Sequence, residues 1–185
     1  MALLESIIIP LGTSLPDFKL KNPSGEEFEG ATLSGDKGFL IGFLCNHCPY
    51  AIAVWPRFVR LAQYAKGLGI NAVAINSNIN PDYPEDSPEE MIKKIREWNI
   101  DFPYLVDEGQ NTARAFKAQC TPDIFLFNSE KKLVYHGRID DNWQDEESAT
   151  KEELKEAIDQ CASGQEISKD QKPSLGCSIK WLNGS

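Results

Sequence analysis

Continuous apolar runs alternate along the chain with stretches of helical periodicity. The segment GFLIGFL at 38–44 is an unbroken apolar run, and INAVAI at 70–75 is apolar except for Asn71, which suits strands that are buried in a sheet. Between them, apolar residues recur every three or four positions over 52–65, which is the pattern of an amphipathic helix. We expect this helix to begin at the two cysteines after the first run and to kink at Pro56.

The remaining elements follow from the same patterns. Alternating apolar and polar residues around Asn-Pro-Ser-Gly predict a hairpin over 17–30, and two capping boxes predict helices that start at 87–90 and at 150–153. We further expect a short strand at 103–107, a short helix at 109–117, and two strands at 124–128 and 133–139 joined by a tight turn.

This order of elements predicts the fold class. Strands that alternate with helices and close in a hairpin are typical of a three-layer α/β/α sandwich around a central mixed sheet. The length of 185 residues suits one hydrophobic core, so we expect a single domain over 1–185 with an N-terminal β-hairpin extension. From residue 165 the chain turns polar and extended, and we expect this tail, 165–185, to dock on the domain.

The composition argues against a membrane segment and against nucleic acid as a partner. With 41% hydrophobic and 25% charged residues and no apolar run of about 18 residues, the chain resembles a globular protein without a membrane segment. A net charge of -9 disfavours nucleic acid as a partner, because phosphate binding needs clustered Lys and Arg. The amino terminus lacks the basic start of an export signal, so we expect a cytoplasmic protein.

The two cysteines at the predicted helix start carry the candidate chemistry. Thiolates are stabilised at a helix amino terminus, and a Cys-x-x-Cys there usually exposes its first thiol. We therefore expect Cys45 to be the nucleophile and Cys48 the resolving thiol. A protonated His47 would stabilise the thiolate further, and Asn46 and Pro49 complete the segment that shapes the site.

Metal binding and the other three cysteines offer alternatives to a redox pair. Zinc uses the same spacing but normally needs four ligands, so we expect no metal unless His136, Cys120 or Cys177 joins in space. Packing is the simplest role for Cys120 and Cys161. For Cys177 two interpretations stay open: a structural residue of the docked tail, or a third redox thiol.

Several motifs together resemble a known family. The chain is similar to bacterial thioredoxin-like proteins that are grouped with the alkyl hydroperoxide reductase and thiol-specific antioxidant superfamily. The motifs are CNHCPY at 45–50, NSN at 76–78, YPEDS at 83–87, FPYLVDE at 102–108, TPDIFLF at 121–127, HGRIDDN at 136–142 and GCSIKW at 176–181.

The resemblance implies a thioredoxin fold and roles for matching positions. Cys45 and Cys48 match the redox pair, Pro122 matches a cis-proline, and Thr121 before it would offer backbone hydrogen bonds to a thiol substrate. One position departs from thioredoxin: Phe39 stands where thioredoxin has a buried carboxylate that helps to deprotonate the second cysteine. The proton acceptor must then come from elsewhere in the chain.

We therefore expect a thiol-disulfide oxidoreductase that needs no organic cofactor, because no dinucleotide-binding glycine pattern is present. Its partners would be a thiol or disulfide substrate and a thiol reductant, and the protein would be a monomer or a homodimer. One alternative is a peroxiredoxin-like antioxidant that uses Cys48-Pro49, for which Arg138 is a distant candidate for the required arginine. Another is a non-catalytic or metal-binding module on the same fold.

Overall fold

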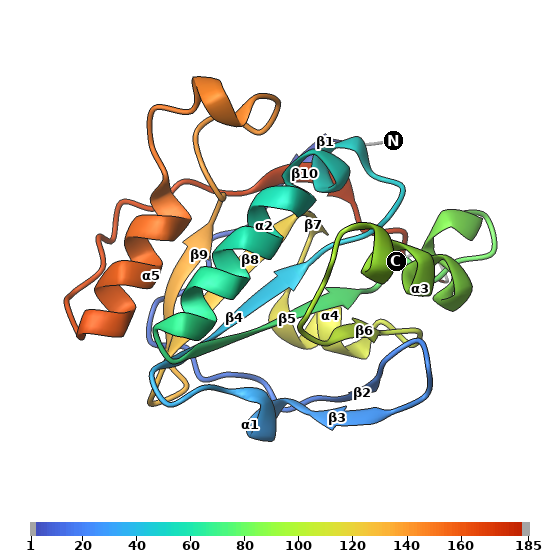
Figure 1. Cartoon of the computed structure of the whole chain (residues 1–185), viewed down its shortest axis with the longest axis horizontal. Coiled ribbons are helices and arrows are strands. Elements are labelled where there is room, and N and C mark those ends of the chain that lie inside the picture. The colour runs from blue at the N-terminus through green and yellow to red at the C-terminus, as the bar shows by residue number, and fades with distance from the viewer. Residues whose placement is uncertain (1–2, 183–185) are drawn as a thin grey trace.

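A seven-stranded mixed sheet forms the centre of the protein, which is described here for residues 3–182 by a computed structural model (Figure 1). Strands β4, β5 and β6 are parallel, and the other neighbours pair antiparallel. In order across the sheet the strands are β3 (Glu27–Glu29), β2 (Lys19–Lys21), β6 (Tyr104–Val106), β5 (Ile70–Asn76), β4 (Gly38–Phe43), β8 (Asp123–Asn128) and β9 (Leu133–Gly137).

Two hydrophobic cores lie on the two faces of this sheet. Successive strand residues point to opposite faces, so in β4 Leu40 enters one core while Phe39 and Ile41 enter the other. The expected three-layer α/β/α arrangement is thereby confirmed. Apolar side chains of α2 (Pro49–Gly67), α3 (Pro88–Glu97) and α5 (Glu153–Ser163) fill the first core, and those of α1 (Gly30–Leu33) and α4 (Asn111–Phe116) the second.

A second, three-stranded sheet brings both ends of the chain together, and the sequence did not predict it. Strand β10 (Leu175–Ser178) lies between β1 (Leu3–Glu5) and β7 (Cys120–Thr121), antiparallel to both. All three strands have at most four residues, too few for a periodic pattern to be recognised.

The C-terminal tail also docks through a buried side chain. The amide of Gln110 donates to the carbonyl of Lys180 at 2.8 Å and accepts from the N–H of Leu182 at 2.7 Å. These two bonds hold Lys180 and Leu182 against the rest of the chain, and residues 183–185 of the expected tail lie outside the described part.

Most predicted elements are present. The cap at Ser87 is confirmed, because its hydroxyl accepts from the N–H of Glu90 at 3.3 Å. Helix α2 includes Pro56 and continues past it as one helix. The second capping box was wrong: Thr150 donates its backbone N–H to Asp141 at 2.7 Å, and α5 starts only at Glu153. Within residues 3–182, no helix has both the length and the apolar composition that crossing a bilayer requires.

Candidate active site

Cys45 and Cys48 lie in the connection between the end of β4 and the start of α2. Both thiols are free, and both are fully buried. The helix begins at Pro49, so Cys48 is its N-cap residue and Cys45 lies one turn earlier. Two expectations are corrected by this geometry: the first thiol is not exposed, and the unpaired N–H groups of the helix meet Cys48 rather than Cys45.

The two sulfurs face the loop of β7 that contains the expected cis-proline. The Thr121–Pro122 peptide bond is cis, which confirms that prediction. Cys45 Sγ lies 3.1 Å from the hydroxyl of Thr121, and Cys48 Sγ lies 3.2 Å from its carbonyl oxygen. Trp55 fixes the loop from the helix side, because its indole N–H donates to the carbonyl of Cys45 at 3.0 Å.

The groups around the two thiols shift their pKa values in opposite directions. A hydrogen bond from Cys45, together with interactions with the Cys177 thiol and the N–H of Ala51, lowers the pKa of Cys48 to about 5 against the opposing effect of burial. Burial, the hydrogen bond to Cys48 and the negative charge of Asp86 raise the pKa of Cys45. These opposite shifts favour the proton on Cys45 and the negative charge on Cys48.

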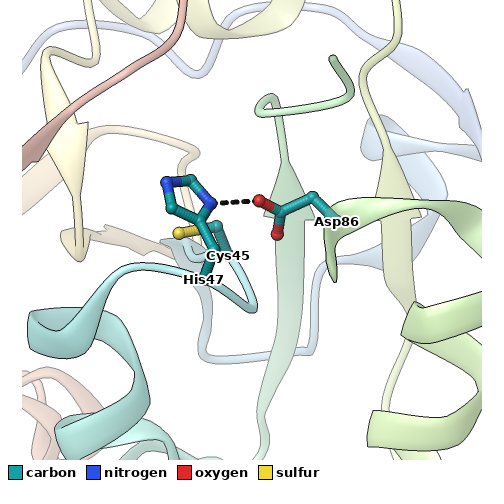
Figure 2. Close-up of side chains that lie close together, drawn as sticks. All are labelled: Cys45, His47 and Asp86. Carbon is teal, nitrogen blue, oxygen red and sulfur yellow. Dashed lines mark hydrogen bonds and ion pairs between the residues drawn. The ribbon is translucent and has the colours of Figure 1, made fainter. Parts of the chain in front are cut away.

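A buried carboxylate that the sequence analysis did not single out organises the loop. Asp86, at the end of a 3₁₀ turn, Pro84–Asp86, is fully buried and accepts from the N–H of Asn46 at 2.6 Å and from the amide of Asn76 at 3.0 Å. Its other oxygen bonds to Nδ1 of His47 (Figure 2). A carboxylate only accepts hydrogen bonds, so Nδ1 of His47 carries the proton of this bond. The signal in the sequence was the YPEDS motif, which contains Asp86.

Cys45, His47 and Asp86 form one cluster (Figure 2). The sulfur, an imidazole nitrogen and a carboxylate oxygen lie within 4.8 Å of one another. A metal ion would have to enter between His47 and Asp86, whose nitrogen and oxygen are in direct hydrogen-bond contact. Asp86 already accepts three hydrogen bonds from protein groups. These observations favour a hydrogen-bonded cluster over a metal centre.

Asn46 and His47 are structural parts of the site rather than solvated loop residues. The Asn46 amide donates to the carbonyl of Glu85 at 2.9 Å and accepts from the hydroxyl of Tyr104 at 3.0 Å. The His47 side chain is only 6% exposed, and its ring lies 4.5 Å from that of Tyr83. Within the described part of the chain, His47 Nε2 is buried and has no hydrogen-bond partner.

The remaining cysteines occupy three different environments. Cys177 is buried opposite Thr121 in the ladder of β10 and β7, and burial together with the interaction with Cys48 raises its pKa to about 12. Cys120 is fully buried, and burial and the charge of Asp123 raise its pKa, which agrees with packing. Cys161 is half-buried on α5, where its thiol points to the carbonyl of Lys37 at 3.7 Å.

A cavity of about 420 Å³ opens beside the cis-proline. Val54 of α2, Pro122 and Leu175 of β10 contribute to its wall, and Trp143 closes it from the loop after β9. The centroid of the Trp143 ring lies 4.0 Å from that of Tyr50, two residues beyond Cys48, with the two rings tilted by 37°. Pro122 connects the cavity with the cis-proline loop that faces the dithiol, and Glu5 and Lys172 add charged groups to its wall.

A buried ion pair holds the loop that carries Trp143. Arg57 of α2 donates to Asp140 at 2.5 Å and to the carbonyl of Trp143 at 2.5 Å. Arg138 bonds to Glu153 at 2.5 Å. Neither arginine is therefore available to the thiolate.

The chain is similar to a known family and to two proteins of known structure. The model of the AhpC/TSA family matches residues 11–136. An uncharacterized conserved protein from Geobacillus kaustophilus, known from a crystal structure, shares 41% sequence identity with this chain. The two structures superpose with a TM-score of 0.94 over 100% of this chain and 99% of that one. A hypothetical protein from Sinorhizobium meliloti 1021 is 36% identical with a TM-score of 0.92, covering 97% and 99%.

A curated relative is more distant. The thiol-disulfide oxidoreductase ResA of Halalkalibacterium halodurans is 26% identical over 124 residues, which are 66% of this chain and 65% of the relative. The chain thus spans slightly less than two thirds of the length of that relative.

Proposed function

Because this chain belongs to the AhpC/TSA family and has the thioredoxin fold, we propose that it is a thiol-disulfide oxidoreductase with Cys45 and Cys48 as its redox pair. One observation carries the proposal: two free thiols at the start of α2 face a cis-proline loop at 3.1 and 3.2 Å. The name of the ResA relative, a thiol-disulfide oxidoreductase, supports it.

The position of Cys48 as the N-cap of α2 and the lowered pKa of its thiol favour Cys48 for the first attack, the reverse of the order expected from the motif. The Cys48 thiolate attacks one sulfur of the substrate disulfide, and the other sulfur leaves as a thiolate. Cys45 then loses its proton and attacks Cys48 Sγ, which releases the second substrate thiol and leaves the Cys45–Cys48 disulfide. Overall the substrate gains two electrons and the protein dithiol loses them.

His47 supplies the proton acceptor for the second step. Asp86 holds the His47 ring in the same cluster as the Cys45 sulfur, and its carboxylate would stabilise the imidazolium that forms when the ring takes the Cys45 proton. Nε2 has no hydrogen-bond partner among the described residues of the reduced protein, so the ring or the thiol must shift before this transfer. Asp86 thus replaces the carboxylate that thioredoxin has at the position of Phe39.

The cavity beside Pro122 indicates a polypeptide or other disulfide with an apolar flank as substrate. Thr121 and Pro122 would bind its backbone at the cis-proline. A second thiol protein or a small thiol would return the electrons. The cytoplasmic location and a monomeric or homodimeric state stay predictions from the sequence.

Peroxide reduction is a second candidate, favoured by the lowered pKa of Cys48 and the proline that follows it. In that reaction the Cys48 thiolate attacks peroxide to give a sulfenic acid, and Cys45 condenses with it to release water. The geometry supports this reaction less well, because Arg57 and Arg138 are both bonded to carboxylates away from the thiolate.

Stopped-flow tryptophan fluorescence separates the two reactions, since Trp55 contacts Cys45 directly. Reduced protein is mixed with a protein disulfide and, separately, with hydrogen peroxide. We expect faster reaction with the disulfide, loss of reaction in Cys48→Ser, and accumulation of a mixed disulfide in Cys45→Ser. Cys161→Ser, far from the pair, is the matched control. Faster reaction with peroxide would instead identify a peroxidase, and a mixed disulfide in Cys48→Ser would restore Cys45 as the nucleophile.

A further inference from the structure

Cys48 has a second thiol neighbour besides Cys45. Its sulfur lies 3.2 Å from the carbonyl oxygen of Thr121, and Thr121 is paired directly with Cys177 across the antiparallel ladder of β7 and β10. Opposite residues in such a ladder have Cα atoms about 4.5–5.5 Å apart. Figure 1 shows β10 at the same edge of the molecule as the amino end of α2, and the two elements are in contact. The Cys48 and Cys177 side chains belong to the same buried cluster.

The backbone of β10 is fitted closely against this loop. A Cβ atom added to Gly176 would lie 2.1 Å from the carbonyl oxygen of Thr121 and 3.0 Å from the ring of Pro122. Only glycine permits this approach, and it brings the next residue, Cys177, to the dithiol. A residue that served only to pack the tail would not need to present a thiol to the redox pair.

The reactivity of Cys177 depends on the state of Cys48. In the reduced protein, burial and the nearby Cys48 charge raise the pKa of Cys177, so it keeps its proton. When Cys48 enters a disulfide its charge disappears, and the contribution of that charge to the pKa of Cys177 disappears with it. Cys177 then becomes more readily ionised at the stage of the cycle at which a resolving thiol is needed.

We propose that Cys177 is a second resolving thiol, which competes with Cys45 for the mixed disulfide on Cys48 and forms a reversible Cys48–Cys177 disulfide. This inference rests on the proposed function, because it needs a mixed disulfide at Cys48.

The step balances without an added oxidant or reductant. The Cys177 thiolate attacks Cys48 Sγ, the bond between Cys48 and the substrate sulfur breaks, and the substrate leaves as a thiolate that takes the proton released by Cys177. The same exchange converts a Cys45–Cys48 disulfide into a Cys48–Cys177 disulfide, with Cys45 as the leaving thiolate. In the product, β10 is covalently tied to the start of α2, and Cys45 is a free thiol again.

Tryptic peptide mapping tests the proposal in full-length protein. Cleavage after Lys and Arg puts Cys45 and Cys48 on one peptide, and Cys120, Cys161 and Cys177 on three others. The Cys45→Ser variant removes the competing thiol, and Cys45→Ala repeats the test with a side chain that cannot hydrogen-bond. Each reduced protein is treated with oxidised glutathione, quenched with an alkylating agent and digested without reduction, and its fluorescence is compared with wild type to verify folding.

We expect the peptide of Cys48 to be cross-linked to that of Cys177 in both variants. The cross-link should be lost in Cys45→Ser/Cys177→Ser, which should retain a glutathione adduct on Cys48, and should persist in Cys45→Ser/Cys161→Ser. A stable adduct on Cys48 with Cys177 alkylated in the single variants would overturn the inference and leave the proposed function intact. Absence of any reaction at Cys48, in wild type and variants alike, would overturn both.

Discussion

The imidazole of His47 is hydrogen-bonded to the buried carboxylate of Asp86, which lies 39 residues further along the chain. This bond fixes the orientation of the ring at the redox pair and leaves Nε2 pointing away from the carboxylate (Figure 2). The acidic group that the motif lacks at Phe39 is thus supplied from a different segment, while Phe39 itself is buried in the core on the other face of the sheet.

Replacing this carboxylate tests its role. Asp86→Asn cannot accept all three hydrogen bonds, and we expect it to lower the free energy of unfolding by about 1–3 kcal/mol and to slow resolution of the mixed disulfide. Urea unfolding and stopped-flow fluorescence measure the two effects. The exposed Asp82→Asn is the control. If Asp86→Asn slows resolution equally in wild type and in a His47→Ala background, Asp86 does not act through His47.

The pH dependence of exchange follows from the lowered pKa of Cys48. The thiolate is the reactive form, so the second-order rate with a disulfide should stay nearly constant above about pH 6 and fall as the pH falls through about 5. Cys45→Ala removes the hydrogen bond that contributes most to the shift, so the fall should then occur at higher pH. A profile that does not move in Cys45→Ala would show that Cys45 does not hold the proton next to Cys48.

The same shift makes the stability of the reduced protein pH-dependent. The pKa of Cys48 is lower in the folded state than the roughly 8.5 of an unfolded cysteine. Its ionisation therefore stabilises the fold fully above the unfolded value, and this contribution is lost as the pH falls through about 5. Urea unfolding across this pH range should show that the free energies of unfolding of reduced wild type and Cys48→Ser become more similar toward low pH.

The ion pair of Arg57 and Asp140 should dominate the stability of the loop that borders the cavity. Both side chains are about 5% exposed, and Asp140→Ala leaves a buried guanidinium without its carboxylate, at a cost of about 3–5 kcal/mol in the free energy of unfolding. Glu146→Ala is the matched control, since its pair with Arg60 joins the same helix and loop but is exposed, and it should cost less than about 1 kcal/mol. Equal losses in urea unfolding would contradict this assignment.

Gly176→Ala probes the position of Cys177 while keeping the thiol. The new methyl group would collide with the Thr121 carbonyl, so β10 must move away from β7, and we expect a loss of about 1–3 kcal/mol in the free energy of unfolding. Cross-linking between Cys48 and Cys177 should decrease in a Cys45→Ser background. Gly67→Ala, where a Cβ meets no atom within 4 Å, is the control. An unchanged yield of cross-link in Gly176→Ala would show that the strand register does not place Cys177.

The sequence by itself predicted most elements of the central sheet and the two cysteines of the candidate site. Apolar segments predicted β4 and β5, and the stripe over 52–65 predicted α2, because a strand or helix that is buried on one or both faces has a regular spacing of apolar residues. The pair Cys45 and Cys48 and the proline at 122 were likewise recognised from local motifs, since each is a short segment whose residue types are informative without their surroundings.

Only the tertiary structure decided which groups surround the two thiols, and these groups lower the pKa of Cys48 and raise that of Cys45. The helix begins one residue after Cys48, a boundary that propensity does not fix, and this places the helix N–H groups on the second thiol rather than the first. Asp86 lies in a 3₁₀ turn, 39 residues after its partner His47. Cys177 lies in a four-residue strand, about 130 residues after Cys48. Hydrogen-bond partners and the pKa of a buried group depend on which distant segments close around it, and no local pattern of residues encodes that closure.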